Sequence, residues 1–176
     1  MPALLPALAA LLSVLVALSD LYARRVPNAW LLGALLVGAP GNAVAWIQGA
    51  PLWPPLAGVA LGLIVLLPFY VIKWMGAGDI KFFATLGFLL GSGALLPIWI
   101  IGSLLCGLHA VAILLHRHQR LYALPIWTMA IARMSHSALG QRIAVARQGR
   151  QGLPYAAYLA FGALFTIFHP ALMHSW

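Results

Sequence analysis

The sequence predicts an all-α, polytopic integral membrane protein with about six transmembrane helices, the fourth of them short or tilted. Two observations favour this class. First, 64% of the residues are hydrophobic and only 7% are charged, and the mean hydropathy is +0.99. Second, the apolar residues form runs close to the length of about 20 residues that a helix needs to cross a bilayer. We expect residues 1–176 to form a single integral membrane domain.

The apolar runs predict spans at residues 3–19, 29–47, 56–72, 79–96, 97–115 and 153–173. A break in the second span is expected near Pro40-Gly41, and Pro68 should kink the third. Gly58 and Gly62 form a small-xxx-small pattern, which favours close packing of the third helix against a neighbour. Gly91-Ser92-Gly93 interrupts the fourth span, which is therefore expected to be short, tilted or re-entrant.

The region from residue 116 to residue 152 is predicted to be a basic cytoplasmic loop. It holds six arginines and an apolar patch, residues 121–132, that is too short to cross a bilayer. A helix lying in the plane of the membrane interface fits this pattern. His116 and His118 are interpreted as interfacial residues, because side chains two positions apart on a helix do not converge on a metal ion.

The charge distribution predicts the orientation of the chain. All ten lysines and arginines fall on the side of the loops that follow the first, third and fifth spans. By the positive-inside rule this side is cytoplasmic, and both termini lie outside the cytoplasm. The net charge of +8 is then explained by anionic lipid headgroups on the cytoplasmic side, and no nucleic-acid partner is expected.

The only two acidic residues of the chain, Asp20 and Asp79, are predicted to lie at the same membrane depth. One acid alone would fit a helix cap or an interfacial anchor. A pair is harder to explain in this way, because ionisable groups at membrane depth are costly and usually functional. Two carboxylates that share one proton can activate a water molecule and protonate a carbonyl oxygen. The pattern predicts a catalytic pair that titrates as a coupled unit.

The residues around Asp79 support this interpretation. Gly76 and Gly78 lack a Cβ atom, so they allow a sharp turn or the close approach of another segment beside the carboxylate. Lys81 could favour ionisation of Asp79, but an anchoring role at the lipid headgroups is the preferred interpretation. The lone cysteine, Cys106, excludes an intramolecular disulfide and is interpreted as a packing residue.

These residues resemble a known family, the type IV prepilin peptidases. The signature of that family is an aspartate that closes an early helix and a second aspartate in a Gly-x-Gly-Asp motif, and Asp20 and Asp79 match these two positions. The resemblance implies that both are catalytic.

Three further segments match in the family's order. Pro27 and Asn28, after the two arginines that follow Asp20, resemble the family's Ile-Pro-Asn element. Gly76 to Lys81 fits the extended aspartate motif, and Leu153-Pro154-Tyr155-Ala156 resembles the Pro-Tyr segment that opens the last helix. The resemblance implies supporting roles for Pro27, Asn28, Gly76, Gly78, Lys81, Pro154 and Tyr155.

The resemblance also implies an activity, a substrate and a location. It implies an aspartic endopeptidase of the bacterial inner membrane that removes the basic leader of a prepilin at the cytoplasmic interface. The chain lacks the cysteine-rich insertion of larger members between the first two spans, where it has only about eight or nine residues. It therefore resembles the short branch associated with Flp or tight-adherence pili. No cofactor or metal is expected, and N-methyltransferase activity and homo-oligomer formation are left open.

Three other functions fit parts of the pattern. In a small proton-coupled transporter the two aspartates would form a relay, although relay acids usually lie near the middle of the membrane. A non-catalytic assembly protein of a pilus or secretion machine would explain the basic loop but not the paired acids. A presenilin-type protease shares Gly-x-Gly-Asp, but its first aspartate follows a tyrosine, whereas Asp20 follows Ser19.

Overall fold

The computed structural model describes residues 4–51, 53–119, 141–142, 145–146 and 153–173. Those residues form helices and contain no strand, which confirms the all-α class. The elements, in chain order, are α1 (Leu4–Ala23), α2 (Asn28–Ile47), α3 (Trp53–Val71), α4 (Ala77–Leu90), η1 (Ser92–Ala94), α5 (Leu95–Gln119), α8 (Tyr155–Phe168) and η2 (Pro170–Met173).

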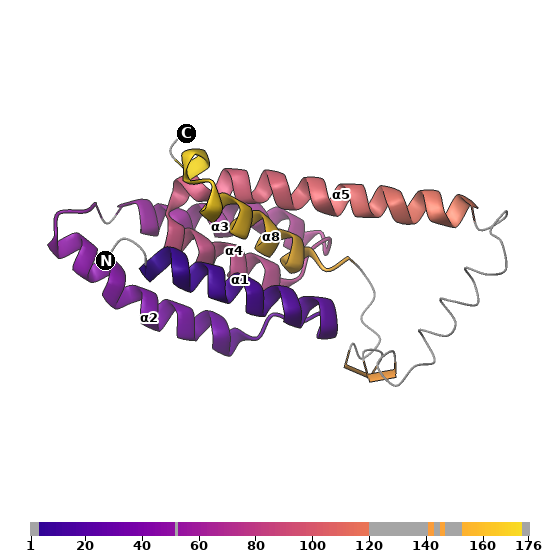
Figure 1. The fold of residues 1–176 in the computed structure, drawn as a ribbon, viewed down its shortest axis with the longest axis horizontal. Helices are drawn as coiled ribbons and strands as arrows, with labels where there is room; N and C mark the ends of the chain where they lie inside the picture. The colour runs from indigo at the N-terminus through magenta and orange to yellow at the C-terminus, as the bar shows by residue number, and fades with distance from the viewer. Residues whose placement is uncertain (1–3, 52, 120–140, 143–144, 147–152, 174–176) are drawn as a thin grey trace.

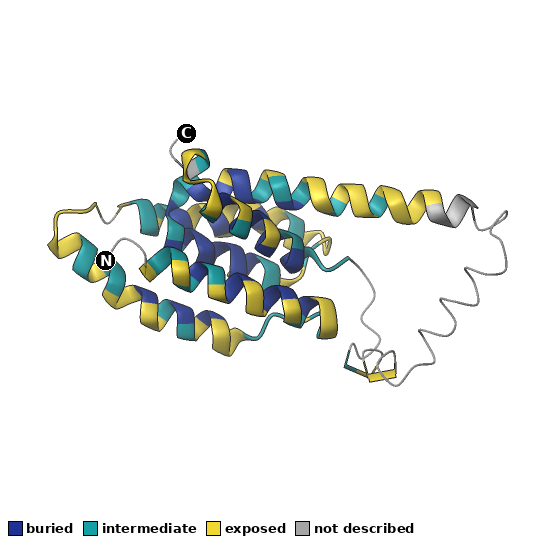
Figure 2. Ribbon diagram, viewed as in Figure 1, coloured by how far each residue is buried: buried dark blue, intermediate teal, exposed yellow. Residues whose placement is uncertain are grey.

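The short helix α4 lies at the centre of the bundle (Figure 1). It packs against α1, α2, α3 and α8, and every residue from Phe82 to Gly87 is buried (Figure 2). At 14 residues, α4 is about 21 Å long at 1.5 Å per residue, which is shorter than the hydrocarbon core of a bilayer. Its neighbours bury most of its length, and its first turn borders a pocket at one end of the bundle.

Glycines bring α3 and α4 into direct backbone contact, as the small-xxx-small pattern predicts. A Cβ atom placed on Gly58 would overlap the backbone of Gly87, and one on Gly62 would lie 2.8 Å from Cα of Ala84. Lipid chains are as apolar as leucine, so helices in a bilayer gain little from burying apolar surface and depend on such close packing. The glycines therefore hold α4 in register against α3.

Two of the predicted boundaries in the first half of the chain were wrong. The first helix continues through Asp20 to Ala23, so the connection to α2 is only residues 24–27. The second helix is continuous through Pro40, and the expected break at Pro40-Gly41 is absent. Pro40 lies in the second half of α2, a helix that packs mainly against α4 and α1, and one missing backbone donor is tolerated there. Pro68 lies inside α3, and the kink there stays a prediction.

In the second half of the chain, the lengths of two helices differ from those predicted. The fourth helix is short, as predicted, and it ends at Leu90 because Gly91 has a φ of +84°. The next helix begins at Leu95 and continues beyond the predicted end at residue 115 to Gln119. The last helix covers only Tyr155–Phe168 of the predicted span 153–173, since Pro170 follows its end.

Within the described residues, four segments are long and apolar enough to cross a bilayer, namely α1, α2, α3 and residues 92–115. The helix α8 is apolar but shorter. Large apolar side chains cover the outside of the bundle, among them Leu104 and Leu108 on α5, each 69% exposed. These features identify a membrane protein. The expected in-plane helix of residues 121–132 lies outside the described residues, and so do the side chains of His116 and His118.

Successive helices run antiparallel through the bundle (Figure 1). The start of α1 and the end of α8 lie together at one end. The end of α1, the connection to α2, the α3–α4 connection and the start of α8 lie at the opposite end. Asp20 and Asp79 are therefore at the same end of the molecule, together with Arg24 and Lys73.

Candidate active site

Asp20 occupies the last turn of α1 and is buried, with an exposed fraction of 6%. The helix ends after Ala23 because Arg24 adopts a left-handed backbone conformation with φ of 51°. The backbone N–H of Arg24 donates to the carbonyl oxygen of Asp20 at 3.0 Å, and the Ser19 hydroxyl donates to the carbonyl oxygen of Arg25 at 2.8 Å. These bonds turn the chain directly beside the carboxylate and lead it into α2.

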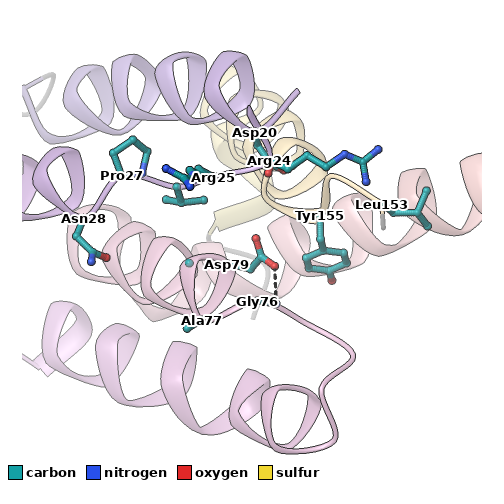
Figure 3. Close-up of a pocket in the computed structure, with 12 residues that line it drawn as sticks. Asp20, Arg24, Arg25, Pro27, Asn28, Gly76, Ala77, Asp79, Leu153 and Tyr155 are labelled. Atoms are coloured by element: carbon teal, nitrogen blue, oxygen red, sulfur yellow. Dashed lines mark hydrogen bonds between the residues drawn. The ribbon is translucent and has the colours of Figure 1, made fainter. Parts of the chain in front are cut away.

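Asp79 occupies the first turn of α4 and is half-buried. Its Oδ2 atom accepts a hydrogen bond from the backbone N–H of Gly76 at 3.0 Å, and its own N–H donates to the carbonyl oxygen of Gly76 at 3.1 Å. The first N–H groups of a helix have no partner within the helix, so an acidic side chain there stabilises the helix start. Asp79 thus caps α4 while one side of its carboxylate faces the pocket (Figure 3).

The start of α8 supplies backbone donors to both aspartates. The N–H of Ala157 donates to Oδ2 of Asp20 at 3.1 Å, and the N–H of Ala156 interacts with the carboxylates of both Asp20 and Asp79. The N-terminus of a helix carries partial positive charge, which favours nearby anions. The end of α1, the start of α4 and the start of α8 therefore converge on one pair of carboxylates.

The two carboxylates line one pocket of about 830 Å³ (Figure 3). They project from α1 and α4 on opposite sides of it, and Asp79 points toward Asp20. The structure brings most of the predicted site residues to this pocket, while Lys81 and Pro154 do not line it. The lining residues are Asp20, Arg24, Arg25, Val26, Pro27, Asn28, Gly76, Ala77, Gly78, Asp79, Leu153 and Tyr155.

The two motif glycines have different structural roles. A Cβ atom on Gly78 would lie 3.0 Å from Cβ of Val26, so the absence of a side chain lets the α1–α2 connection approach the start of α4. Gly76 has φ of −78°, which any residue adopts, and a Cβ atom there would make ordinary contact with Asp79. Close approach is therefore the role of Gly78, and neither glycine has the positive φ of a sharp glycine turn.

Lys81 and Asn28 interact with each other instead of with the acids. The ammonium group of Lys81 donates to Oδ1 of Asn28 at 3.4 Å. Residues two positions apart on a helix point in different directions, which is why Lys81 faces α2 while Asp79 faces the pocket. An anchoring role of Lys81 at the headgroups stays a prediction.

The Pro154-Tyr155 segment begins α8 next to the pocket. Pro154 precedes the first helical residue, where its missing N–H costs nothing. The Tyr155 side chain lines the pocket, and its hydroxyl is hydrogen-bonded to the Ser103 hydroxyl of α5 at 2.9 Å. This bond ties the start of α8 to α5 and so positions the amides that face the two aspartates.

Sequence reasoning missed several contributors to the pocket. Arg24, Arg25 and Val26 were matched only to the family's basic stretch and Ile-Pro-Asn element and were not assigned to the site, although they line the pocket. The amides of Ala156 and Ala157 carry no signal in their side chains, although the apolar run from residue 153 and the Pro154-Tyr155 segment predicted a helix start there. Two nitrogen atoms of the Arg24 side chain, Nε and Nη1, are buried without a hydrogen-bond partner. They are donors beside Asp20 that no group of the described chain uses.

Cys106 lies in α5, half-buried and without a disulfide. Among the residues that the structure describes, histidine, cysteine and acidic side chains form no group of three or more that could hold a metal ion. The interpretation of Cys106 as a packing residue stays a prediction.

The fold and the pocket define a helical membrane protein with two carboxylates at one end of its bundle. Residues 7–111 match the type IV leader peptidase family, and the chain belongs to that family. The matched region contains Asp20, Asp79 and the whole segment from Gly76 to Lys81, and it ends within α5 before the Pro154-Tyr155 segment. Comparison with curated proteins and with solved structures gave no match. Membership of this family indicates that the chain is a peptidase.

Proposed function

We propose that this chain is an aspartic endopeptidase that removes the leader peptide of type IV or Flp prepilins at the cytoplasmic face of the bacterial inner membrane. The observation that carries the proposal is the convergence of Asp20 and Asp79 on one pocket from helices α1 and α4. These are the only two acidic side chains in the sequence. Their position at the same end of the bundle as Arg24 and Lys73 supports a cytoplasmic site, with both chain termini on the other side.

The chemistry follows from two carboxylates that share one proton. The ionised aspartate removes a proton from a water molecule, whose oxygen attacks the carbonyl carbon of the scissile bond, while the protonated aspartate donates to the carbonyl oxygen. The resulting tetrahedral intermediate breaks its C–N bond, and the departing amine takes the proton that the first aspartate removed from water. One hydroxyl of the intermediate returns its proton to the second aspartate as the new carboxyl group forms, which restores the starting pair. The amides of Ala156 and Ala157 hold the pair in place through these steps.

The test is cleavage of a defined precursor by the purified protein. A prepilin of the Flp type is incubated with the protein in detergent or proteoliposomes, and the new N-terminus is mapped by mass spectrometry. We expect a single cut between the leader and the apolar segment, and no cut with Asp20→Asn. If the wild-type protein cuts no prepilin, or if Asp20→Asn cuts at an undiminished rate, the proposal is wrong.

A further inference from the structure

A second cavity lies beside the candidate active site, between α2 and α3. These two helices each pack against α4 but make little contact with each other, so α4 forms the floor of a groove between them. The groove has a volume of about 380 Å³. Its walls and floor are Leu31, Leu32 and Leu35 of α2, Val59 and Leu63 of α3, and Ala84 and Thr85 of α4, with Asn28 and Lys81 at one end.

The groove is apolar along most of its length and polar at one end. The Thr85 hydroxyl donates to the carbonyl oxygen of Lys81 at 2.8 Å, so its one hydrogen is already used within α4. The polar end is the Asn28–Lys81 hydrogen bond. Asn28 also lines the active-site pocket, so the groove and the pocket adjoin at this residue.

We propose that this groove binds the membrane-embedded apolar segment of the substrate that adjoins the scissile bond. This inference rests on the proposed function. A chain that leaves the pocket at Asn28 and enters the bilayer must satisfy its own backbone groups, which in lipid requires a helix. Such a helix presents a row of apolar side chains, which the leucines, Val59 and Ala84 of the groove can contact. The charged and polar end contacts the part of the substrate nearest the cut.

The dimensions of the groove fit this occupant. From Asn28 to Leu35 it extends seven residues along α2, which is about 10 Å at 1.5 Å per residue. Two turns of a substrate helix would span that length. The small side chain of Ala84 on the floor lets a helix approach α4, and Leu63, 40% exposed on the α3 wall, would pack against the side of that helix.

The first experiment tests whether a substitution that narrows the groove weakens cleavage of the substrate with the apolar segment. Leu63→Trp places a larger side chain in the groove, and Leu104→Trp on the outer face of α5 is the matched control. Each protein is assayed with a full precursor and with a soluble peptide that has the same residues around the cut but ends before the apolar segment. For Leu63→Trp we expect the ratio of kcat/KM for precursor to kcat/KM for peptide to fall about tenfold, mainly through KM. The control should keep the wild-type ratio.

The second experiment detects the substrate in the groove directly. Cys106→Ser removes the native thiol, Asp79→Asn keeps the precursor uncut, and Leu35→Cys or Leu104→Cys supplies the probe. A precursor with one cysteine about two turns into its apolar segment should crosslink to the cysteine at position 35 and not to the one at position 104.

The outcomes separate this inference from the proposed function. If the wild-type protein cuts neither substrate, the proposed function fails. If it cuts both while Leu63→Trp keeps the wild-type ratio, or if positions 35 and 104 crosslink equally, only the groove assignment is wrong. The groove then holds lipid.

Discussion

The carboxylate of Asp20 accepts a hydrogen bond from the backbone N–H of Ala157, a residue 137 positions further along the chain. The bond joins the end of the first helix to the start of the last, and it lies next to Asp79. The candidate site is therefore complete only when α8 has packed against α1, which is one of the most extensive contacts in the bundle. Residues near the end of the described chain thus set the geometry of an acid near its beginning.

The first prediction concerns the two carboxylates. Asp20→Asn and Asp79→Asn should each reduce precursor cleavage by at least about 100-fold, because an amide keeps the shape of the side chain but loses the acid–base function. The double variant should be no worse than either single variant, since the pair acts as a unit. Mass spectrometry of the products and membrane fractionation measure cleavage and insertion. Substantial cleavage by a correctly inserted single variant would contradict a shared-water mechanism.

The second prediction concerns the motif glycines. Gly78→Ala should reduce activity more than Gly76→Ala, because the added Cβ atom would crowd Val26 in one case and make only ordinary contact in the other. We expect a difference of about tenfold in kcat/KM, which corresponds to about 1.4 kcal/mol. The two proteins are compared at equal concentration in the same detergent. Equal losses would show that close approach to Val26 is not what Gly78 provides.

The third prediction concerns proximity in the resting state. In a Cys106→Ser background, Asp20→Cys and Asp79→Cys should be joined by a short thiol-reactive crosslinker when both are present. A direct disulfide requires Cα atoms within about 7 Å, so a crosslinker is the safer reagent. The chain is then cut at a protease site engineered between Ile47 and Trp53, and the two fragments should remain linked on a gel.

The control pair for this crosslinking is Asn28→Cys with Lys81→Cys, whose native side chains are hydrogen-bonded at 3.4 Å. This pair also spans the engineered cut. If the control fragments stay joined while the aspartate positions separate, the two acids are not neighbours before substrate binds, and the mechanism needs a substrate-driven closure.

The fourth prediction concerns orientation. A reporter fused after Trp176 should lie outside the cytoplasm, and reporters inserted at Gln119 or Gln148 should lie inside, because the lysines and arginines fall on one side of the predicted spans. Paired enzymatic reporters, one active only in each compartment, measure this. A cytoplasmic reporter at Trp176 would mean that one helix, most simply the short α4, does not cross.

The fifth prediction compares the ends of α2 and α3. After each helix a residue in the left-handed conformation donates to the carbonyl oxygen three positions earlier, and the next residue donates to the one five positions earlier. The left-handed residue is Gly49, with φ of 92°, after α2 and Lys73, with φ of 60°, after α3. A left-handed conformation costs a residue with a Cβ atom about 1–2 kcal/mol. Gly49→Ala should therefore lower the free energy of unfolding by about 1 kcal/mol. The Lys73→Gly variant should have a higher free energy of unfolding than the Lys73→Ala variant by a similar amount. Thermal unfolding in one detergent checks both, and no difference between the two Lys73 variants would refute the argument.

The sequence by itself determined the class of the protein and the location of its acids. Runs of apolar residues about 20 long leave a chain little choice but to form membrane helices, because backbone groups must be satisfied internally in lipid. Gly58 and Gly62 likewise predicted a close helix contact, since small residues have few other uses on an apolar helix face. The placement of Asp20 and Asp79 at one end of the bundle followed from counting spans.

Only the tertiary structure decided which groups surround those acids. Every residue except proline carries the same backbone N–H, so nothing in the sequence distinguishes Ala156 and Ala157 as the donors that face Asp20. The continuity of α2 through Pro40 and the close approach of Val26 to Gly78 also depend on neighbouring helices. The existence of the helices follows from local composition, whereas their ends and the pockets follow from which helices pack together, and that packing is a property of side-chain shapes summed over the whole bundle.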